Sequence, residues 1–74
     1  MKGTIKTTGN NAEYRLELNN ITVNEVIVCA TTLTDNYSVS VTKIEPSTLL
    51  FNTFDCFNNT NKTSSIDYVI FYKD

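Results

Sequence analysis

The sequence predicts a small all-β protein, an antiparallel β-sandwich of about six strands, with a small barrel as the alternative. Apolar side chains alternate with polar ones, and no stretch shows the spacing of an amphipathic helix. Turn-forming residues separate these segments at intervals of roughly 10–12 residues. The chain has 74 residues, which is enough for a single domain, and we assign residues 1–74 to it.

The first three strands expected along the chain differ in pattern. Residues 4–8 form a short, Thr-rich segment. Residues 13–18 place Tyr14, Leu16 and Leu18 on one face and charged side chains on the other. Residues 25–33 are apolar on both faces. The alternation at residues 13–18 predicts a strand with one face in a core and the other in water, which is typical of antiparallel sheets.

The remaining three expected strands repeat these patterns. Residues 37–42 alternate apolar side chains with hydroxyl side chains, residues 49–57 are rich in Phe, and residues 66–72 are apolar on both faces. A chain of this size buries only about 60% of the surface that it exposes when unfolded. It therefore lacks the material to cover both faces of two strands, and we expect it to associate with other subunits.

Asn and Asp dominate four of the five expected turns, at residues 9–11, 19–20, 34–36 and 58–61, and the fifth, at 45–47, is Glu-Pro-Ser. Both residue types tolerate the left-handed backbone conformation that turns require. Because the chain has only two glycines, we expect Asn and Asp to replace glycine in these turns.

The sequence offers little chemistry for catalysis or for cofactors. It contains no His, the usual general base near neutral pH, and the carboxylates of Asp35, Asp55 and Asp67 belong to a chain too small for a deep cleft. Asp35 and Asn36 supply two oxygen ligands, whereas Ca²⁺ takes six to eight. We expect neither enzymatic activity nor a bound metal or cofactor.

The two cysteines, Cys29 and Cys56, lie in apolar stretches and lack the spacing of a redox or zinc motif. We expect buried free thiols, with a disulfide as the alternative. The net charge of −2 offers little attraction for nucleic acid. The longest uncharged apolar run, residues 26–30, is far shorter than the roughly 20 residues that span a bilayer. Residues 1–6 lack the apolar core of a signal peptide, so we expect synthesis in the cytoplasm, without membrane insertion.

Asn, Thr and Ser together account for 27 of the 74 residues. Short amides and hydroxyls, together with aromatic rings near strand ends, match the hydroxyl groups and apolar faces of sugars. The alternative interpretation is that Asn and Thr are ordinary turn and strand residues. The composition is therefore compatible with carbohydrate binding but does not establish it.

The order of segments from residue 20 to residue 74 resembles a known family. An apolar strand at 26–28, a polar turn at 35–36 and an alternating strand at 39–44 come first. An aromatic-rich strand at 51–57 and a terminal strand at 66–72 follow. This order resembles the small lectin-like domains of bacteriophage tail fibres and receptor-binding proteins, similar in outline to H-type lectins. The resemblance implies a six-stranded sandwich that forms trimers and binds host-surface sugars at the virion.

These observations favour a non-enzymatic, virion-associated module that recognises a host-surface carbohydrate or receptor. The alternatives are a capsid decoration or other structural virion protein, and a small phage-encoded inhibitor of a host protein. Expected partners are further copies of the chain, with a trimer favoured, and a host glycan or other virion proteins. The expected ligand-binding residues lie in two polar loops and at one strand end: Asp35, Asn36, Tyr37, Asn58, Asn59, Asn61 and Tyr72.

Overall fold

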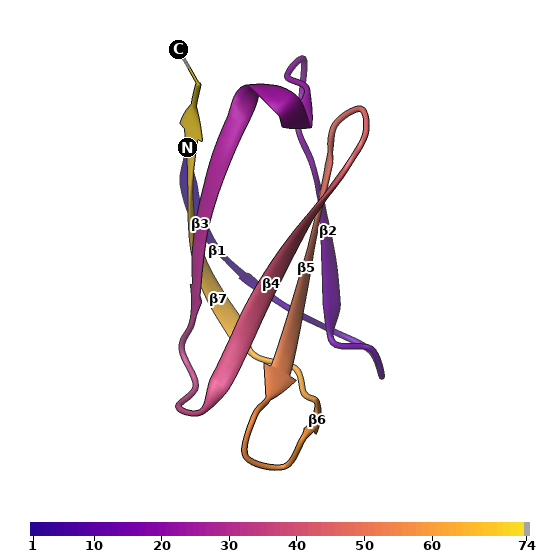
Figure 1. Cartoon of the computed structure of the whole chain (residues 1–74), viewed down its shortest axis with the longest axis vertical. Helices are drawn as coiled ribbons and strands as arrows, with labels where there is room; N and C mark the ends of the chain where they lie inside the picture. The colour runs from indigo at the N-terminus through magenta and orange to yellow at the C-terminus, as the bar shows by residue number, and fades with distance from the viewer. Residues whose placement is uncertain (74) are drawn as a thin grey trace.

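The structure, a computed structural model, describes residues 1–73 as a small β-sandwich of two antiparallel sheets (Figure 1). Its elements are β1 (Lys2–Lys6), β2 (Glu13–Glu17), a 3₁₀ turn η1 (Val23–Glu25), β3 (Val26–Thr32), β4 (Tyr37–Ile44), β5 (Thr48–Asp55), β6 (Thr60–Asn61) and β7 (Ser65–Tyr72). The predicted all-β class is confirmed. Within the described residues, no helix has the length and hydrophobicity needed to cross a membrane.

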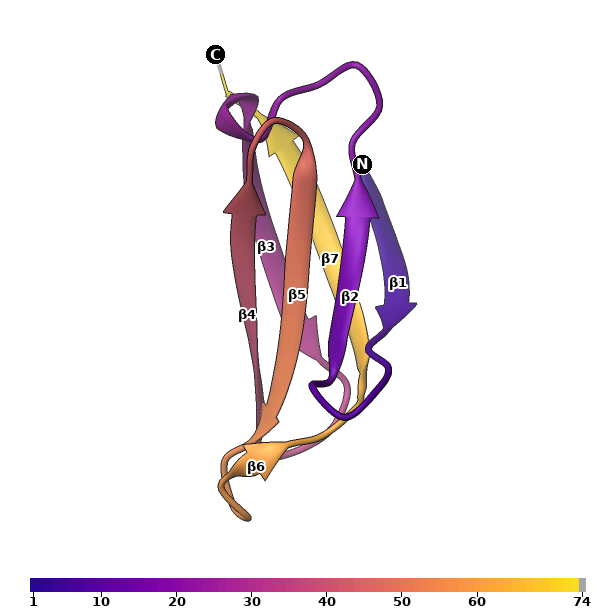
Figure 2. The same cartoon turned by 90° about the vertical axis from the view of Figure 1, so that its right-hand side faces the viewer.

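One sheet has the strand order β1–β7–β3, and the other has the order β2–β5–β4 with the short β6 added to the end of β5. Figure 2 shows the second sheet in front of the first. All six expected strands are present, with shifted ends: β1 starts two residues earlier than expected, and β5 ends at Asp55 instead of at residue 57. The two-residue β6 was not predicted, because Thr60 and Asn61 show no apolar alternation.

The core lies between the two sheets and is built from the alternating apolar positions. Phe51 of β5 and Tyr68 of β7 meet across it, with ring centroids 5.7 Å apart. The other buried apolar side chains of this cluster are Leu18, Val23, Val26, Leu49, Ile66 and Ile70. The predicted inward face of the second strand is confirmed, because Tyr14, Leu16 and Leu18 all pack on this core.

Asparagine takes the place of glycine in three of the turns, as predicted. Asn20, Asn36 and Asn59 have φ values of 60°, 66° and 57°, which lie in the left-handed region. At Gly3 the need for glycine is different. A Cβ atom there would lie 2.8 Å from the hydroxyl oxygen of Tyr68, so β1 passes close to this ring only because residue 3 has no side chain.

The two strands that are apolar on both faces are neighbours in one sheet. In the antiparallel register of β3 and β7, Ile27 lies opposite Phe71 and Cys29 lies opposite Val69. These four side chains alternate with buried residues such as Val26 and Ile70, and they are exposed on the outer face of the sheet. The sandwich therefore covers only the inner face of each strand.

The prediction of buried cysteines is wrong. Cys29 and Cys56 are both exposed, and both are free thiols. Cys29 belongs to the outward-facing set of β3, and Cys56 follows the end of β5 in a turn. An apolar sequence neighbourhood indicates burial only when the position faces the core, and neither position does.

Candidate functional site

Two polar loops lie side by side at one end of the sandwich. The turn of residues 33–36 joins β3 to β4, and residues 56–59 join β5 to β6. Both lie at the lower end in Figure 2, whereas the N-terminus and the C-terminal end of β7 lie at the upper end. The backbone N–H of Cys56 donates to the carbonyl oxygen of Asn36 at 2.9 Å. We call the surface formed by residues 33–37 and 56–61 the loop end.

A chain of hydroxyl groups anchors the loop end to both sheets. The backbone N–H of Ser64 donates to Thr7 Oγ1 at 2.9 Å, and Thr53 Oγ1 donates to the carbonyl oxygen of Lys62 at 2.6 Å. Thr7 Oγ1 and Thr53 Oγ1 share a 2.6 Å hydrogen bond in which either hydroxyl can donate, and the Ser64 carbonyl oxygen is a second acceptor for Thr7 Oγ1 at 3.3 Å. Thr7 and Thr53 are both fully buried. The second anchor is the 2.8 Å bond between Thr34 Oγ1 and Ser64 Oγ.

The buried hydroxyl groups explain part of the high Thr and Ser content of the chain. Thr7, Thr53 and Ser64 are buried and form the hydrogen bonds that hold the base of the loops. Abundant Thr and Ser are therefore partly explained by the interior of the molecule. These buried Thr and Ser residues are therefore not evidence for a sugar-binding surface.

Asp55 shapes the turn that follows β5. Its side chain is buried, and Oδ1 accepts hydrogen bonds from the backbone N–H groups of Phe57 and Asn58 at 3.0 and 3.1 Å. Asn58 Nδ2 donates to Oδ2 at 2.7 Å. These bonds, that of the Asn58 side chain first, hold the pKa of Asp55 below its ordinary value, against the effect of burial. The carboxylate is therefore ionised at neutral pH, where it organises the loop and has no proton to donate.

Phe57 is the exposed aromatic side chain of the loop end, with 83% of its surface accessible. The sequence pattern predicts that Phe57 belongs to the strand of residues 49–57, together with Phe51 and Phe54. The strand ends earlier, because Asp55 bonds to the backbone N–H groups of Phe57 and Asn58 and closes a turn. The signal that could have revealed this is the Asp-x-x-Asn sequence at 55–58, since Asp and Asn side chains form such turns with nearby backbone groups.

The structure brings most of the predicted binding residues together. Asp35 and Asn36 lie in the β3–β4 turn, and Asn58, Asn59 and Asn61 lie in and beside the β5–β6 loop; all five are exposed. The Asn58 amide is already bonded to Asp55.

Two predicted binding residues are placed differently. Tyr37 begins β4 opposite Asp55 and is half-buried, so its ring offers less free surface than that of Phe57. Tyr72 lies opposite Val26 at the far end of the sandwich, where it cannot share a small ligand with the loop end.

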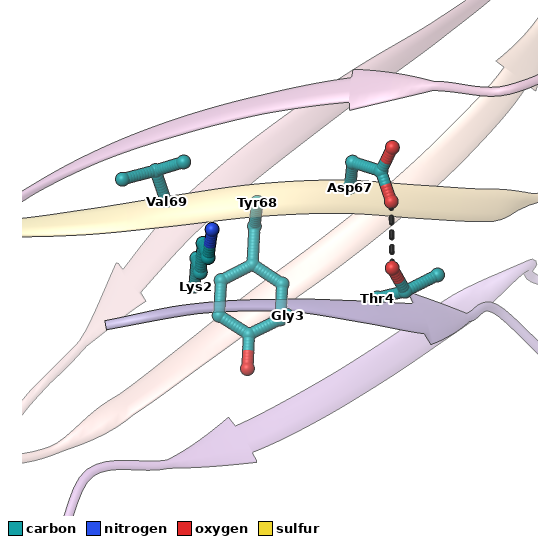
Figure 3. A pocket seen from close by; sticks show the side chains of 6 residues that line it. All are labelled: Lys2, Gly3, Thr4, Asp67, Tyr68 and Val69. Carbon is teal, nitrogen blue, oxygen red and sulfur yellow. Dashed lines mark hydrogen bonds between the residues drawn. The ribbon is translucent and has the colours of Figure 1, made fainter.

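A second surface feature is a shallow hollow of about 430 Å³ over β1 and β7, lined by Lys2, Gly3, Thr4, Asp67, Tyr68 and Val69. Figure 3 shows the Tyr68 ring crossing β1 at Gly3, beside the hydrogen bond from Thr4 to Asp67. That bond runs from Thr4 Oγ1 to Asp67 Oδ1 and measures 2.6 Å. The hollow is open and holds one cationic and one anionic side chain.

Among residues 1–73 there is no cluster of three or more His, Cys, Asp or Glu side chains placed to hold a metal ion. Comparison of the chain with models of protein families, with curated proteins and with solved structures finds no match. Any functional assignment therefore depends on the surfaces described above.

Proposed function

We propose that the protein is a non-enzymatic, virion-associated binding module whose loop end recognises a carbohydrate or other polar receptor on a host surface. The observation that carries this proposal is the pairing of two polar loops by the Cys56–Asn36 hydrogen bond, with the Phe57 ring exposed beside them. The resemblance of residues 20–74 to lectin-like tail-fibre domains supports the same assignment.

The chemistry of the loop end suits a sugar. Asp35 offers a carboxylate, while Asn59 and Asn61 offer amide donors and acceptors on short side chains that lose little entropy on binding. The Phe57 ring can lie against the C–H face of a pyranose, because an exposed aromatic ring is a large apolar surface in a polar setting. Asp55 holds the backbone of Phe57 from below, so the ring is attached to an ordered turn.

An array of bacterial surface polysaccharides and simple oligosaccharides, probed with the protein immobilised at high density, tests the proposal. We expect specific binding that Phe57→Ala weakens by about tenfold or more, because a central aromatic contact contributes on the order of 2 kcal/mol. Folding should be unaffected, since Phe57 is 83% exposed. Tyr72→Ala, at the other end, is the matched control and should leave binding unchanged.

Two outcomes would count against this function. The first is the absence of binding above background to any surface polysaccharide or intact host cell. The second is binding that depends on Tyr72 and not on Phe57, which would place the ligand away from the loop end. If particle stability responds to the variants while host attachment does not, the structural virion role is favoured instead.

A further inference from the structure

Strand β1 has an open edge with free backbone hydrogen-bonding groups. β1 lies at the end of its sheet, and at the start of the ladder Met1 exchanges backbone hydrogen bonds with Ile70. In an antiparallel ladder such bonds come from alternate residues of the strand. The intervening residues therefore direct their N–H and C=O groups away from β7, and these residues are Lys2, Thr4 and Lys6. Among residues 1–73 these groups form no hydrogen bond.

The two sides of the sandwich differ in how the sheets meet. On the side of β3 and β4, Lys43 Nζ of β4 donates to the carbonyl oxygen of Val26 in β3 at 2.7 Å. On the side of β1 and β2, the sheets are joined near one end, where Thr8 and Glu13 exchange backbone bonds of 3.0 and 3.1 Å. From there β1 and β2 diverge toward the N-terminus (Figure 1). The edge of β1 is therefore accessible to another chain.

The Tyr68 hydroxyl adds a polar group to this edge. The ring crosses β1 at Gly3, and its oxygen lies on the side of β1 away from β7 (Figure 3). Among residues 1–73 the hydroxyl forms no hydrogen bond, whereas every fully buried side-chain nitrogen or oxygen atom has a partner. The hydroxyl oxygen is therefore accessible to solvent, and it can bond to a chain that lies against β1.

Two lysines give the edge its charge. Lys2 and Lys6 are exposed on the outer face of β1, on either side of Thr4. Among residues 1–73 neither ammonium group forms a hydrogen bond or an ion pair, and Asp67, one strand further in, accepts its hydrogen bond from Thr4 Oγ1. Lysines on an edge strand discourage pairing with an uncharged chain. They favour a strand with acidic residues, because opposite charges on paired strands attract.

We propose that the open edge of β1 binds an extended, acidic segment of a partner protein as an added antiparallel strand. The backbone groups of the edge supply the hydrogen bonds, as in other proteins that recognise peptides by strand addition. Because residues that lie opposite each other share a face of the sheet, β1 determines the pattern of the segment. Acidic residues four positions apart lie opposite Lys2 and Lys6 on the outer face. Apolar residues lie opposite Gly3 and Ile5 on the inner face, where Ile5 already packs on the core.

A second copy of the chain does not fit this edge through its own β1. If two β1 strands pair antiparallel over their full length, Lys2 of each copy lies opposite Lys6 of the other, because β1 spans Lys2–Lys6. Like charges directly opposite each other destabilise a strand pair. The partner is therefore a different chain. This inference does not depend on the proposed function, because it involves the edge of β1 and not the loop end.

Isothermal titration calorimetry of the full chain with a synthetic peptide, Ser-Glu-Val-Thr-Val-Glu-Ser with both ends blocked, tests the proposal. The charge control is the peptide Ser-Lys-Val-Thr-Val-Lys-Ser. We expect the Glu peptide to bind about tenfold more tightly than the Lys peptide, and the preference to reverse in Lys2→Glu/Lys6→Glu. Amide hydrogen exchange followed by NMR should show that the Glu peptide protects the backbone N–H of Thr4.

Two variants of Thr4 test the backbone hydrogen bonds. Thr4→Pro removes an N–H that makes no bond to β7, and proline is tolerated at such edge positions, so circular dichroism should show a folded protein. Thr4→Val is the matched control, because both variants lose the bond to Asp67 and only the Pro variant lacks the N–H. We expect Thr4→Val to bind the Glu peptide as the wild type does, and Thr4→Pro to bind it about tenfold more weakly.

Three results would overturn the proposal: no binding of the Glu peptide, equal binding of the two peptides, or equal binding by the two Thr4 variants. A dimer in sedimentation equilibrium that the Glu peptide does not dissociate, and that Thr4→Pro does, would show that a second copy occupies the edge, which also contradicts it.

Discussion

Replacement of Thr53 by Val tests the buried hydroxyl chain that supports the loop end. The exchange keeps the shape of the side chain and removes the hydroxyl, which donates to the Lys62 carbonyl at 2.6 Å and shares a second hydrogen bond of 2.6 Å with Thr7 Oγ1. Thr53 and Thr7 are both fully buried, so water cannot replace the bond between them. We expect the variant to fold, with lower stability.

The expected magnitude follows from the two lost bonds. Each contributes about 1 kcal/mol net, so the free energy of unfolding should fall by about 2 kcal/mol. For a domain of this size, 1 kcal/mol shifts the melting temperature by about 4–8 °C. The melting temperature of Thr53→Val should therefore drop by at least about 8 °C.

Thermal and urea denaturation, followed by circular dichroism, measure this change. Thr42→Val is the matched control, because Thr42 is exposed on the outer face of β4. It should alter stability by no more than about 0.5 kcal/mol. If Thr53→Val is as stable as the wild type, or more stable, the hydroxyl chain does not hold the base of the loops and our account of the loop end fails.

Two further predictions concern close contacts and pH. Gly3→Ala should lower the free energy of unfolding by about 1–3 kcal/mol, since the new Cβ meets the Tyr68 hydroxyl at 2.8 Å; thermal melting should show partial recovery in Gly3→Ala/Tyr68→Phe, and equal melting temperatures for Gly3→Ala and the wild type would contradict the contact. The pKa of Asp55 is lowered in the folded state, chiefly by the Asn58 side chain, so its stabilising contribution is complete above the ordinary aspartate pKa and is lost as the pH falls below about 4. Melting curves between pH 2.5 and 7 should show a smaller acid-induced loss for Asp55→Asn, which is also less stable at pH 7; an unchanged slope would exclude this role for Asp55.

Much of the fold could be predicted from local patterns. Alternation at residues 13–18 and 37–42 identified strands and their inner faces, because a side chain on a strand faces either the core or water. The positive φ values of Asn20, Asn36 and Asn59 follow from the scarcity of glycine in a chain with many turns.

Other features depend on which strands become neighbours, and local patterns do not contain that information. The pairing of β3 with β7 is what joins Ile27 to Phe71 and Cys29 to Val69 on one outer face. The sequence indicates two strands that are apolar on both faces, but it contains no signal that they are adjacent. The same limit explains the exposure of Cys29, whereas Cys56 is exposed because β5 ends before it.

The candidate site was predicted in part. The two polar loops were identified from their Asn and Asp residues, but their hydrogen-bonded contact is a consequence of the sheet order. Phe57 was assigned to a strand because aromatic residues favour strands, whereas the local bonds of Asp55 end the strand first. Burial of Thr53 and Thr7 could not be expected from composition, since hydroxyl side chains are usually exposed.

The relation of β1 to β7 makes the chain suitable for circular permutation. The start of β1 and the end of β7 are neighbours, with the Met1 amino group bonded to the Ile70 carbonyl, so a short peptide joining the two ends would turn β7 and β1 into a hairpin. New ends opened between residues 56 and 59 would then cut the segment that carries Phe57 while leaving both sheets intact. In this permuted chain both sheets can form while the loop that carries Phe57 is cut. Folding and binding at the loop end could then be measured independently.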